Sequence, residues 1–249
     1  MDSRMRNIRM VLQYEGTRYQ GWQRQVSSDN TIQGKLEQLL SRVLSEEIEV
    51  SGSGRTDAGV HAKGQVANFH TKSNMSLEEL QETINRYLPE DIAVVELAEA
   101  SSRFHSRLNA CGKRYCYRIV YSKVPDVFLR RFSFQVTEAL DLEAMRQGAS
   151  YLCGEHDFKA FTSAKKGKKS TVRRIDSIEI AEKQGLLTMT FEGNGFLHHM
   201  VRILVGTLLE IGQGKRMPES VKALLIEGDR AQAGFLAPAK GLTLEKVFF

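Results

Sequence analysis

The chain has 249 residues, 41% of them hydrophobic, which predicts a globular protein with a sizeable core and excludes a disordered chain. Its net charge of +5 and its pI of about 9.1 fit a polyanionic partner such as RNA, although many small enzymes are equally basic. No stretch approaches the ~20 apolar residues of a membrane span, and the N-terminal segment lacks the apolar core of a signal peptide, so we expect a cytoplasmic protein without membrane contact.

The first half of the chain begins with a predicted strand and a capped helix. Residues 7–14 alternate apolar and polar side chains, as in a strand with one face in the core. Asn30, followed three positions later by Gln33, resembles a capping box that opens an amphipathic helix over 32–43. A short strand is predicted at 47–52, where the chain reaches a glycine.

A second helix and strand follow. Ser76 and Glu79 form another capping-box pattern, and the helix that they open is predicted to run to Tyr87. Pro89 disfavours the helical conformation in the residue before it, so the helix ends there. Residues 92–98 are rich in apolar and β-branched side chains and predict a strand.

The second half of the chain begins near residue 110 with a predicted strand at 113–122, which is rich in aromatic and β-branched residues. Asp141 is a predicted N-cap for a helix over 142–153. Residues 171–181 and 186–192 indicate two strands of a hairpin, joined at a glycine.

Two further helices and a final strand are predicted in the rest of the chain. An apolar stripe predicts a helix over 197–211, Pro218 is expected in the first turn of a further helix, and the final LTLEKVFF predicts a last strand. Each half therefore mixes two helices with several strands in a similar order, without a visible sequence repeat. The pattern predicts an α+β fold with mainly antiparallel sheets and two domains, 1–110 and 111–249.

A run of lysines over 165–169 is the one strong cluster of like charge. It is compatible with a solvated loop and also with a mobile arm that grips phosphates. The sequence leaves both interpretations open.

The segment 51–62, SGSGRTDAGVHA, carries the densest pattern of chemistry. Three glycines within eight residues indicate tight turning or close backbone approach to a ligand. Asp57 is the one acidic residue of the segment, and Arg55 stands two positions before it. A carboxylate kept ionised by a nearby cation and partly removed from water is a usable nucleophile.

Two other interpretations of this segment compete with the catalytic one. The first is a purely structural turn in which Asp57 caps a backbone N–H group. The second is a phosphate-binding loop, because Gly52 and Gly54 begin a GxGxxG pattern; Asp57, however, occupies the third glycine position, where an acid would repel a pyrophosphate. The P-loop pattern is also missing, since Trp22 follows Gly21 where a lysine is required.

The segment GRTDAGVH, residues 54–61, resembles the signature loop of the TruA family, the pseudouridine synthases that modify the anticodon arm of tRNA. The resemblance covers nearly the whole chain. It is carried by YxGxxYxGWQRQ at 14–25, GQV at 64–66, FHxR at 104–107, KRYxY at 113–117, GEHDF at 154–158, FxHHMVR at 196–202 and APAxGL at 237–242.

The resemblance implies a fold and a reaction. It implies two ferredoxin-like α+β units with an active site in the cleft between them, and a homodimer. It implies isomerisation of uridine to pseudouridine at positions 38, 39 and 40 of the tRNA anticodon stem-loop, without a cofactor or a metal. No redox change occurs in such an isomerisation, which agrees with the lack of cofactor motifs.

The resemblance also implies roles for matching residues. Asp57 would be the nucleophile, Tyr115 would stack on the target uracil, and Arg202 would pair with Asp57. Arg55 would hold the RNA or help to flip the base, because the target base must leave its stack before it is reached. Arg107 and His61 are further candidates for substrate binding.

A metal site is not expected. His198 and His199 are adjacent, so on a helix they would point in different directions, and no HExxH pattern occurs. The cysteines are odd in number and form no CxxC pair, which indicates neither a disulfide framework nor a zinc site. Two rival functions remain: an RNA-binding module without catalysis, and an enzyme that acts on a small nucleotide.

Overall fold

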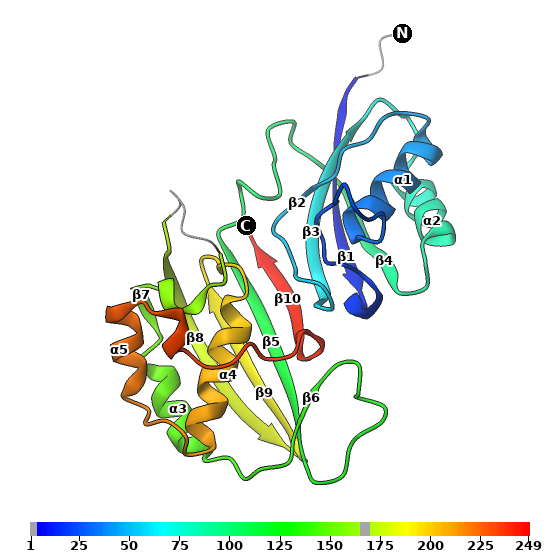
Figure 1. Cartoon of the computed structure of the whole chain (residues 1–249). Helices are drawn as coiled ribbons and strands as arrows, with labels where there is room; N and C mark the ends of the chain where they lie inside the picture. Colours follow the sequence, from blue (N-terminus) through cyan, green and yellow to red (C-terminus); the bar gives the residue numbers. More distant parts are fainter. Residues whose placement is uncertain (1–3, 165–169) are drawn as a thin grey trace. The chain divides into compact units, whose positions relative to one another are not determined.

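The computed structural model describes residues 4–164 and 170–249 (Figure 1), so the lysine run at 165–169 lies outside the described residues. The chain packs as two compact units, one of Met1–Cys111 with Leu244–Phe249 and one of Gly112–Thr243. The first unit thus includes the C-terminal residues, which the predicted division at residue 110 assigned to the second domain. Within the described ranges, no helix combines the length and apolar character that crossing a bilayer requires.

The first unit has the β-α-β-β-α-β order of a ferredoxin-like unit. Its elements are β1 (Arg6–Tyr14), α1 (Ile32–Leu44), β2 (Ser51–Gly52), β3 (His61–Thr71), α2 (Leu77–Tyr87) and β4 (Ile92–Ala100). The strands run in the order β4-β1-β3, β2 pairs with β3, and each of these pairs is antiparallel. The residues of β10 (Leu242–Phe248) that belong to this unit lie beside β3.

The core of the first unit lies between its sheet and its two helices, which cover the same face (Figure 1). The alternation predicted for the first strand is confirmed, because Ile8, Met10 and Leu12 are completely buried. The helices contribute the buried side chains of Leu36, Leu40, Leu80 and Ile84. Ser76 caps α2 as predicted, since its Oγ accepts a hydrogen bond from the Glu79 N–H group (3.2 Å).

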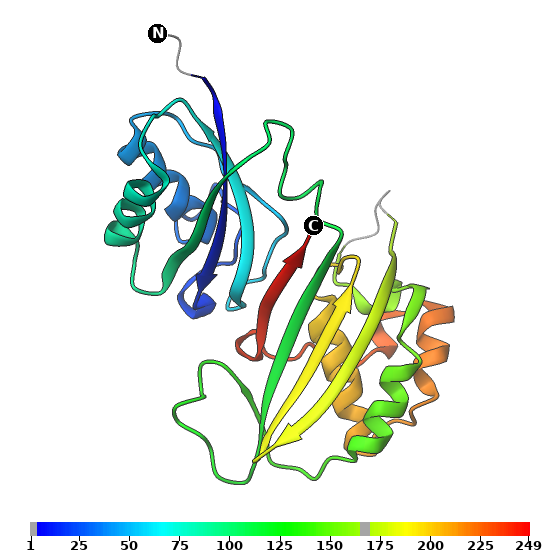
Figure 2. The same cartoon turned by 180° about the vertical axis from the view of Figure 1, so that it is seen from behind.

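The second unit is built on the strand order β5-β9-β8-β7, with β6 added parallel to β5. Its strands are β5 (Gly112–Tyr121), β6 (Phe134–Val136), β7 (Gly154–Asp157), β8 (Val172–Lys183) and β9 (Leu186–Gly193). Its helices are α3 (Leu142–Ser150), α4 (Met200–Gly212) and α5 (Ser220–Glu227), and they cover one face of this sheet (Figure 2). Its single 3-10 turns are η2 (Lys159–Phe161), η3 (Arg230–Gln232) and η4 (Ala239–Gly241), whereas η1 (Gly16–Arg18) belongs to the first unit.

Local signals explain two features of the second unit. Asp141 caps α3 as predicted, because its Oδ1 accepts hydrogen bonds from the N–H groups of Glu143 and Ala144 (3.0 and 2.9 Å). The predicted hairpin of β8 and β9 is confirmed, with Gln184 and Gly185 both at positive φ, as a two-residue type I′ turn requires. The mixed α+β class with mainly antiparallel strands is therefore confirmed.

Several predicted boundaries in the first unit were wrong. Thr31, not Asn30, caps α1, because its side chain accepts the N–H group of Gly34 (3.2 Å). The strand predicted at 47–52 is reduced to Ser51–Gly52, since the backbone of Val50 bonds to side chains of α1 instead of to a strand. β3 was not predicted at all.

The second unit also differs from its predicted boundaries. α3 ends at Ser150 instead of residue 153, and α4 begins at Met200 instead of residue 197. Pro218 precedes the N-cap of α5, Glu219, and so lies just outside the first turn. The short strands β6 and β7 were missed.

Candidate active site

The loop that carries Asp57 connects β2 to β3, and a buried glutamine of β3, Gln65, bonds to the first residues of this loop. The Gln65 side chain is completely buried, and its Oε1 accepts a hydrogen bond from the Ser53 hydroxyl (2.7 Å). Its Nε2 donates to the carbonyl oxygen of Gly54 (3.0 Å). The Ser53 N–H group also donates to the Val66 carbonyl (2.8 Å), so the start of the loop is fixed to β3.

The segment that follows β1 holds the same loop from the other side. The Tyr14 hydroxyl shares a 2.8 Å hydrogen bond with the Thr56 hydroxyl, and both side chains are buried. The Trp22 N–H group donates to the Thr56 carbonyl (3.0 Å), and the Gly59 N–H group donates to the Tyr19 carbonyl (3.3 Å). The residue before Asp57 and the residue two positions after it are therefore both bonded to one segment.

Two glycines of this segment allow the close approach. Gly21 has a φ of +90°, and a β-carbon there would lie 2.6 Å from the Thr56 carbonyl oxygen. A β-carbon on Gly16 would lie 2.0 Å from the Val60 carbonyl oxygen. Any larger residue at either position would push the segment away from the loop.

Asp57 itself is partly exposed, and its carbonyl accepts the N–H group of Val60 (3.1 Å), which closes the turn. Gly59 adopts a φ of +78° in this turn. Arg55 is exposed two positions before Asp57. The loop thus has a fixed backbone and presents one acidic and one basic side chain, which suits a polyanionic substrate with a reactive centre.

His61 and Arg107, the other candidates in the first unit, differ in exposure. His61 is buried, and its Nδ1 accepts a hydrogen bond from the Gly16 N–H group (3.0 Å), so its ring orders the turn after β1. Arg107 is exposed, and its N–H group donates to Nδ1 of His105 (3.1 Å). The buried Ser106 fixes this segment, because its N–H group donates to the Asn68 side chain (2.9 Å).

Tyr115 lies on β5 in the second unit, opposite Phe191 of β9. Its ring meets the ring of Phe196 edge to face, with centroids 5.3 Å apart and planes at 86°. The neighbouring Arg114 forms an ion pair with Glu192. The Tyr115 side chain is buried, with 7% of its area exposed, on a strand that also carries basic side chains. An aromatic ring beside basic side chains is the combination that stacks on a nucleobase, once the base can reach the ring.

Arg202 is one of only two residues of α4 that are not buried, the other being Glu210. The Arg202 Nε group donates to the carbonyl oxygen of Ala237 (2.8 Å), and the Ala237 N–H group donates back to the Arg202 carbonyl (3.2 Å). This pair of bonds orients the guanidinium from a helix that is otherwise part of the core.

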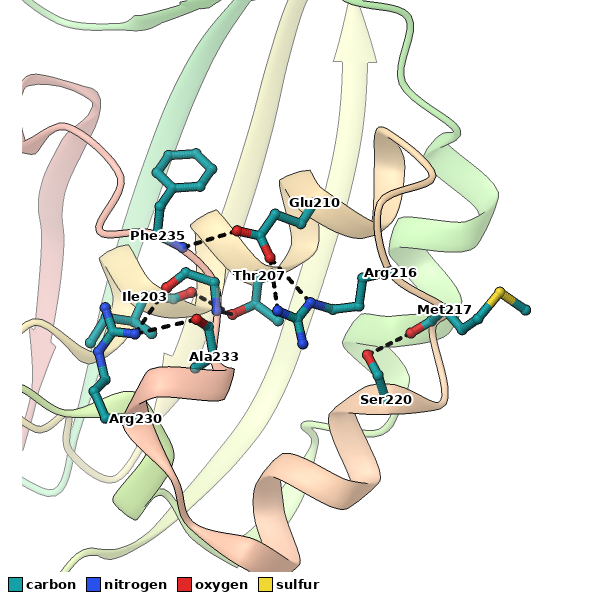
Figure 3. A network of polar contacts seen from close by, with 10 residues as sticks. Ile203, Thr207, Glu210, Arg216, Met217, Ser220, Arg230, Ala233 and Phe235 are labelled. Carbon is teal, nitrogen blue, oxygen red and sulfur yellow. Dashed lines mark hydrogen bonds and ion pairs between the residues drawn. The ribbon is translucent and has the colours of Figure 1, made fainter.

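A polar network fixes the segment that contacts Arg202 (Figure 3). Glu210 pairs with Arg216 (2.8 Å) and also accepts the Phe235 N–H group (3.2 Å). The Thr207 hydroxyl accepts the N–H group of Gly234 (2.9 Å) and donates to the Ile203 carbonyl (2.9 Å). Residues 233–237 are thereby attached along α4.

The expectation that His198 and His199 lie on a helix and point in different directions was wrong. His198 and His199 precede α4, and His199 is its N-cap with a φ of +64°. Their rings consequently stack, with centroids 3.7 Å apart and planes at 29°, instead of pointing in different directions. The His198 carbonyl accepts the Thr162 hydroxyl (3.1 Å). His198 and Arg202 therefore do not share a helix face.

Burial controls the protonation of two tyrosines near these groups. Loss of solvent raises the pKa of Tyr14, and the hydrogen bond to Thr56 opposes this change in part. Loss of solvent likewise raises the pKa of Tyr117, against the attraction of the Arg202 charge for the phenolate. Both phenols remain neutral near pH 7 and are able to donate hydrogen bonds.

The structure thus brings Asp57 together with residues that had no predicted role. Tyr14, Trp22 and Gln65 belong to the motifs of the resemblance, yet sequence reasoning assigned them no function. Their only signal was their place in those motifs. Arg55, Asp57, His61 and Arg107 belong to the first unit, whereas Tyr115 and Arg202 belong to the second.

Comparison with known proteins defines the class. The family model described as tRNA pseudouridine synthase matches residues 10–108 and 149–249. The tRNA pseudouridine synthase A of Bacillus sp. (strain KSM-64) is 47% identical over 98% of this chain and 100% of its own length. The tRNA pseudouridine synthase A 1 of Clostridium tetani (strain Massachusetts / E88) is 45% identical over 98% of this chain and 99% of its own.

These matches define an isomerase that acts on uridine in tRNA. The chain belongs to the tRNA pseudouridine synthase family, and the enzyme class predicted from its motifs is confirmed. Among solved structures, an archaeal box H/ACA sRNP Nop10–Cbf5 complex covers 72% of this chain and 39% of its own at 14% identity, with a TM-score of 0.33.

Proposed function

We propose that the chain converts uridine to pseudouridine at positions 38, 39 and 40 of the tRNA anticodon stem-loop, with Asp57 as the nucleophile. The observation that supports this most is the loop around Asp57. Its backbone is bonded at Ser53, Gly54, Thr56 and Gly59, while the Asp57 side chain is partly exposed. A fixed backbone below a reachable carboxylate is the preorganisation that nucleophilic catalysis needs.

The reaction balances without any co-reactant. The bond from N1 of uracil to C1′ of ribose breaks, the base rotates, and a bond from C5 to C1′ forms. The proton on C5 is released and N1 ends with a proton. Asp57 would attack C1′, add to C6 of uracil, or assist removal of a proton from C2′, and all three routes end in loss of the C5 proton.

Tyr115 and Arg55 are proposed to hold the flipped nucleotide. Removal of a base from its stack costs a few kcal/mol. Stacking on an aromatic ring returns about 1–3 kcal/mol per base, which is the role proposed for Tyr115. Arg55 is exposed beside Asp57, where its guanidinium would bind phosphate or occupy the space left by the base.

Arg202 is proposed to pair with the Asp57 carboxylate when substrate is bound and to keep it ionised. The orientation of Arg202 by the Ala237 carbonyl supports a role for this guanidinium that is more specific than surface charge. Arg107 is proposed to contact the RNA backbone. His61 is proposed to assist substrate binding indirectly, because its buried ring orders the turn after β1.

We further propose that the enzyme is a homodimer and acts in the cytoplasm, and that the reaction proceeds without a cofactor or a metal. Sedimentation velocity over a range of protein concentrations tests the dimer. A species with the mass of a single chain at all concentrations would contradict it.

The test of the reaction uses unmodified tRNA transcripts that carry tritium at C5 of uridine. Each transcript has a uridine at only one of positions 38, 39 and 40, and no metal or nucleotide is added. We expect release of tritium to water by the wild-type enzyme for each position. Asp57→Ala and Asp57→Asn should abolish release while tRNA affinity stays within a few-fold, and Asp29→Asn, which changes an exposed acid, should act as the wild type does.

Turnover by both Asp57 variants would contradict the assignment of the nucleophile. Tritium release from other positions in preference to 38–40 would contradict the proposed specificity. Binding of tRNA without release by any protein would support the rival function, an RNA-binding module without catalysis.

A further inference from the structure

We infer that Tyr14 is a positioning residue for Asp57, acting through the hydroxyl group of Thr56. The inference deepens the proposed function, because it assumes that Asp57 performs the chemistry. Tyr14 is not proposed to touch the substrate. Its phenol is proposed to fix the peptide from which the Asp57 side chain projects.

The hydroxyl of Tyr14 is an exception on its strand. The other inward residues of β1 are Ile8, Met10 and Leu12, which are apolar and completely buried. Tyr14 continues this stripe at its end and is only 4% exposed, so a phenylalanine would fill the same core position. The β1–β3 register shifts between Leu12 and Tyr14, which places the irregularity of the strand directly beside this side chain.

The partner of the phenol is the residue that precedes Asp57. The oxygen atoms of Tyr14 and Thr56 lie 2.8 Å apart in a buried position. The Thr56 carbonyl is held at the same time by the Trp22 N–H group (3.0 Å). With its side chain and its carbonyl both bonded, Thr56 is restrained at two points, which limits the movement of the backbone that carries Asp57.

The ring of Trp22 reinforces this arrangement. Its centroid lies 6.3 Å from that of Tyr14, and its edge lies against Gly52, where a β-carbon would come within 2.5 Å. The Trp22 ring therefore packs beside both the Tyr14 ring and the start of the Asp57 loop. A displacement of about 1 Å at a catalytic group reduces rates roughly 10²-fold, so loss of one hydroxyl far from substrate should be visible in kcat.

The test compares Tyr14→Phe with Tyr19→Phe. The Tyr19 hydroxyl donates to Asp91 (2.5 Å), so both variants remove one bonded phenol from the same segment, and only Tyr14 bonds to the loop through its side chain. For Tyr14→Phe we expect kcat of tritium release to fall about 10-fold or more, with KM for tRNA within 2-fold. Tyr19→Phe should keep kcat within 2-fold.

Melting temperatures separate positioning from stability. We would measure kcat well below the melting temperature of each variant. If the role of Tyr14 were merely structural, Tyr14→Phe would lower the melting temperature and leave kcat unchanged. That result would overturn the inference. A fall in kcat of equal size in Tyr19→Phe would overturn it too, because the effect would then belong to the whole segment.

Variants of Thr56 keep the test decisive if Tyr14→Phe folds poorly. Thr56→Ser retains the hydroxyl and should retain kcat, whereas Thr56→Val removes it and should match Tyr14→Phe. The double variant Tyr14→Phe/Thr56→Val should be no slower than Tyr14→Phe, because Tyr14→Phe already removes the bond to Thr56. Independent, multiplied losses would contradict the inference. Failure of this inference can be distinguished from failure of the proposed function. The proposed function fails if Asp57→Asn turns over, whatever the result for Tyr14→Phe.

Discussion

A β-carbon added to Gly206 would lie 1.9 Å from the carbonyl oxygen of Phe235. Glycine at position 206 therefore lets the backbone of the segment that binds Arg202 lie directly against the middle of α4. Gly234 approaches the same helix equally closely, because a β-carbon added to it would lie 2.4 Å from the Thr207 nitrogen. The absence of side chains at these two positions therefore decides where the Arg202 partner lies.

We expect Gly206→Ala to destabilise the protein by about 1–3 kcal/mol, although alanine normally stabilises a helix interior by about 1 kcal/mol. Urea unfolding measures the change. Gly148→Ala in α3 is the control, because its β-carbon would meet the Ile211 Cδ1 atom (2.7 Å), the end of a flexible side chain. Equal stability of Gly206→Ala and the wild type would contradict the close contact.

Glu37 should contribute to stability through its buried bonds more than through its ion pair. Its Oε1 accepts the Val50 N–H group and Nε2 of Gln33, each at 3.0 Å, and Arg24 pairs with its Oε2 (3.0 Å). Glu37→Ala leaves two buried donors without this acceptor and should cost about 2–4 kcal/mol. Arg24→Ala should cost less than about 1 kcal/mol, because the Arg24 side chain is 63% exposed. Chemical unfolding of both variants compares the two losses, and similar values would refute this ranking.

Stability should fall in alkaline solution because of buried phenols. Burial raises the pKa of Tyr117, so its folded form stays protonated where an unfolded tyrosine ionises, near pH 10. The unfolded state then binds fewer protons, and the free energy of unfolding falls as pH rises above ~10, by up to ~1.4 kcal/mol per pH unit for this group.

Tyr117→Phe should reduce that slope between about pH 10 and 11, while lowering stability near pH 8 by about 1 kcal/mol through loss of the bond to the Pro238 carbonyl (2.8 Å). Urea titrations at several pH values measure both effects. Tyr87→Phe, at an exposed site, controls for the substitution. A slope unchanged from wild type would show that Tyr117 does not cause the alkaline loss.

Arg202 should not be replaceable by lysine. Its Nε donates to the Ala237 carbonyl from a planar guanidinium, a geometry that an ammonium group cannot reproduce. We expect Arg202→Lys to lower kcat about 10²-fold with unchanged circular dichroism. Arg216→Lys, in the network of Figure 3, should retain activity within 3-fold. Full activity of Arg202→Lys would argue that positive charge alone suffices.

The lysine run at 165–169 should contribute to tRNA binding. Replacement of its four lysines by alanine should weaken binding and reduce the slope of log Kd against log salt by about 0.7–0.9 for each phosphate that the variant no longer neutralises. Filter binding at several salt concentrations measures the slope. The control replaces four exposed lysines elsewhere: Lys72, Lys123, Lys183 and Lys215. Equal slopes for the two variants would mean that only net charge matters.

Features of the fold that depend on neighbouring residues were predictable. The stripe of β1, the caps Ser76 and Asp141, and the turn at Gln184-Gly185 all follow from interactions within a few residues of the chain. β3 was missed because its interior is buried on both faces, including Asn68 and Gln65, so no alternation was visible. The strand expected before residue 51 failed because Gln33 and Glu37 bond the backbone of Val50.

In the candidate site, too, only features that depend on neighbouring residues were predictable. The sequence alone determined the class of enzyme and led to the proposal of Asp57 as the nucleophile, because the motif around it is contiguous and carries a single acid. Only the tertiary structure decided what fixes that residue, since Tyr14 lies 42 positions before Thr56 and becomes its partner only when β1 pairs with β3. Likewise, the orientation of Arg202 depends on the Ala237 carbonyl, 35 positions later, and on two glycines that let the chain approach α4. Bonds between distant residues leave no local pattern, because their geometry exists only after the backbone has folded.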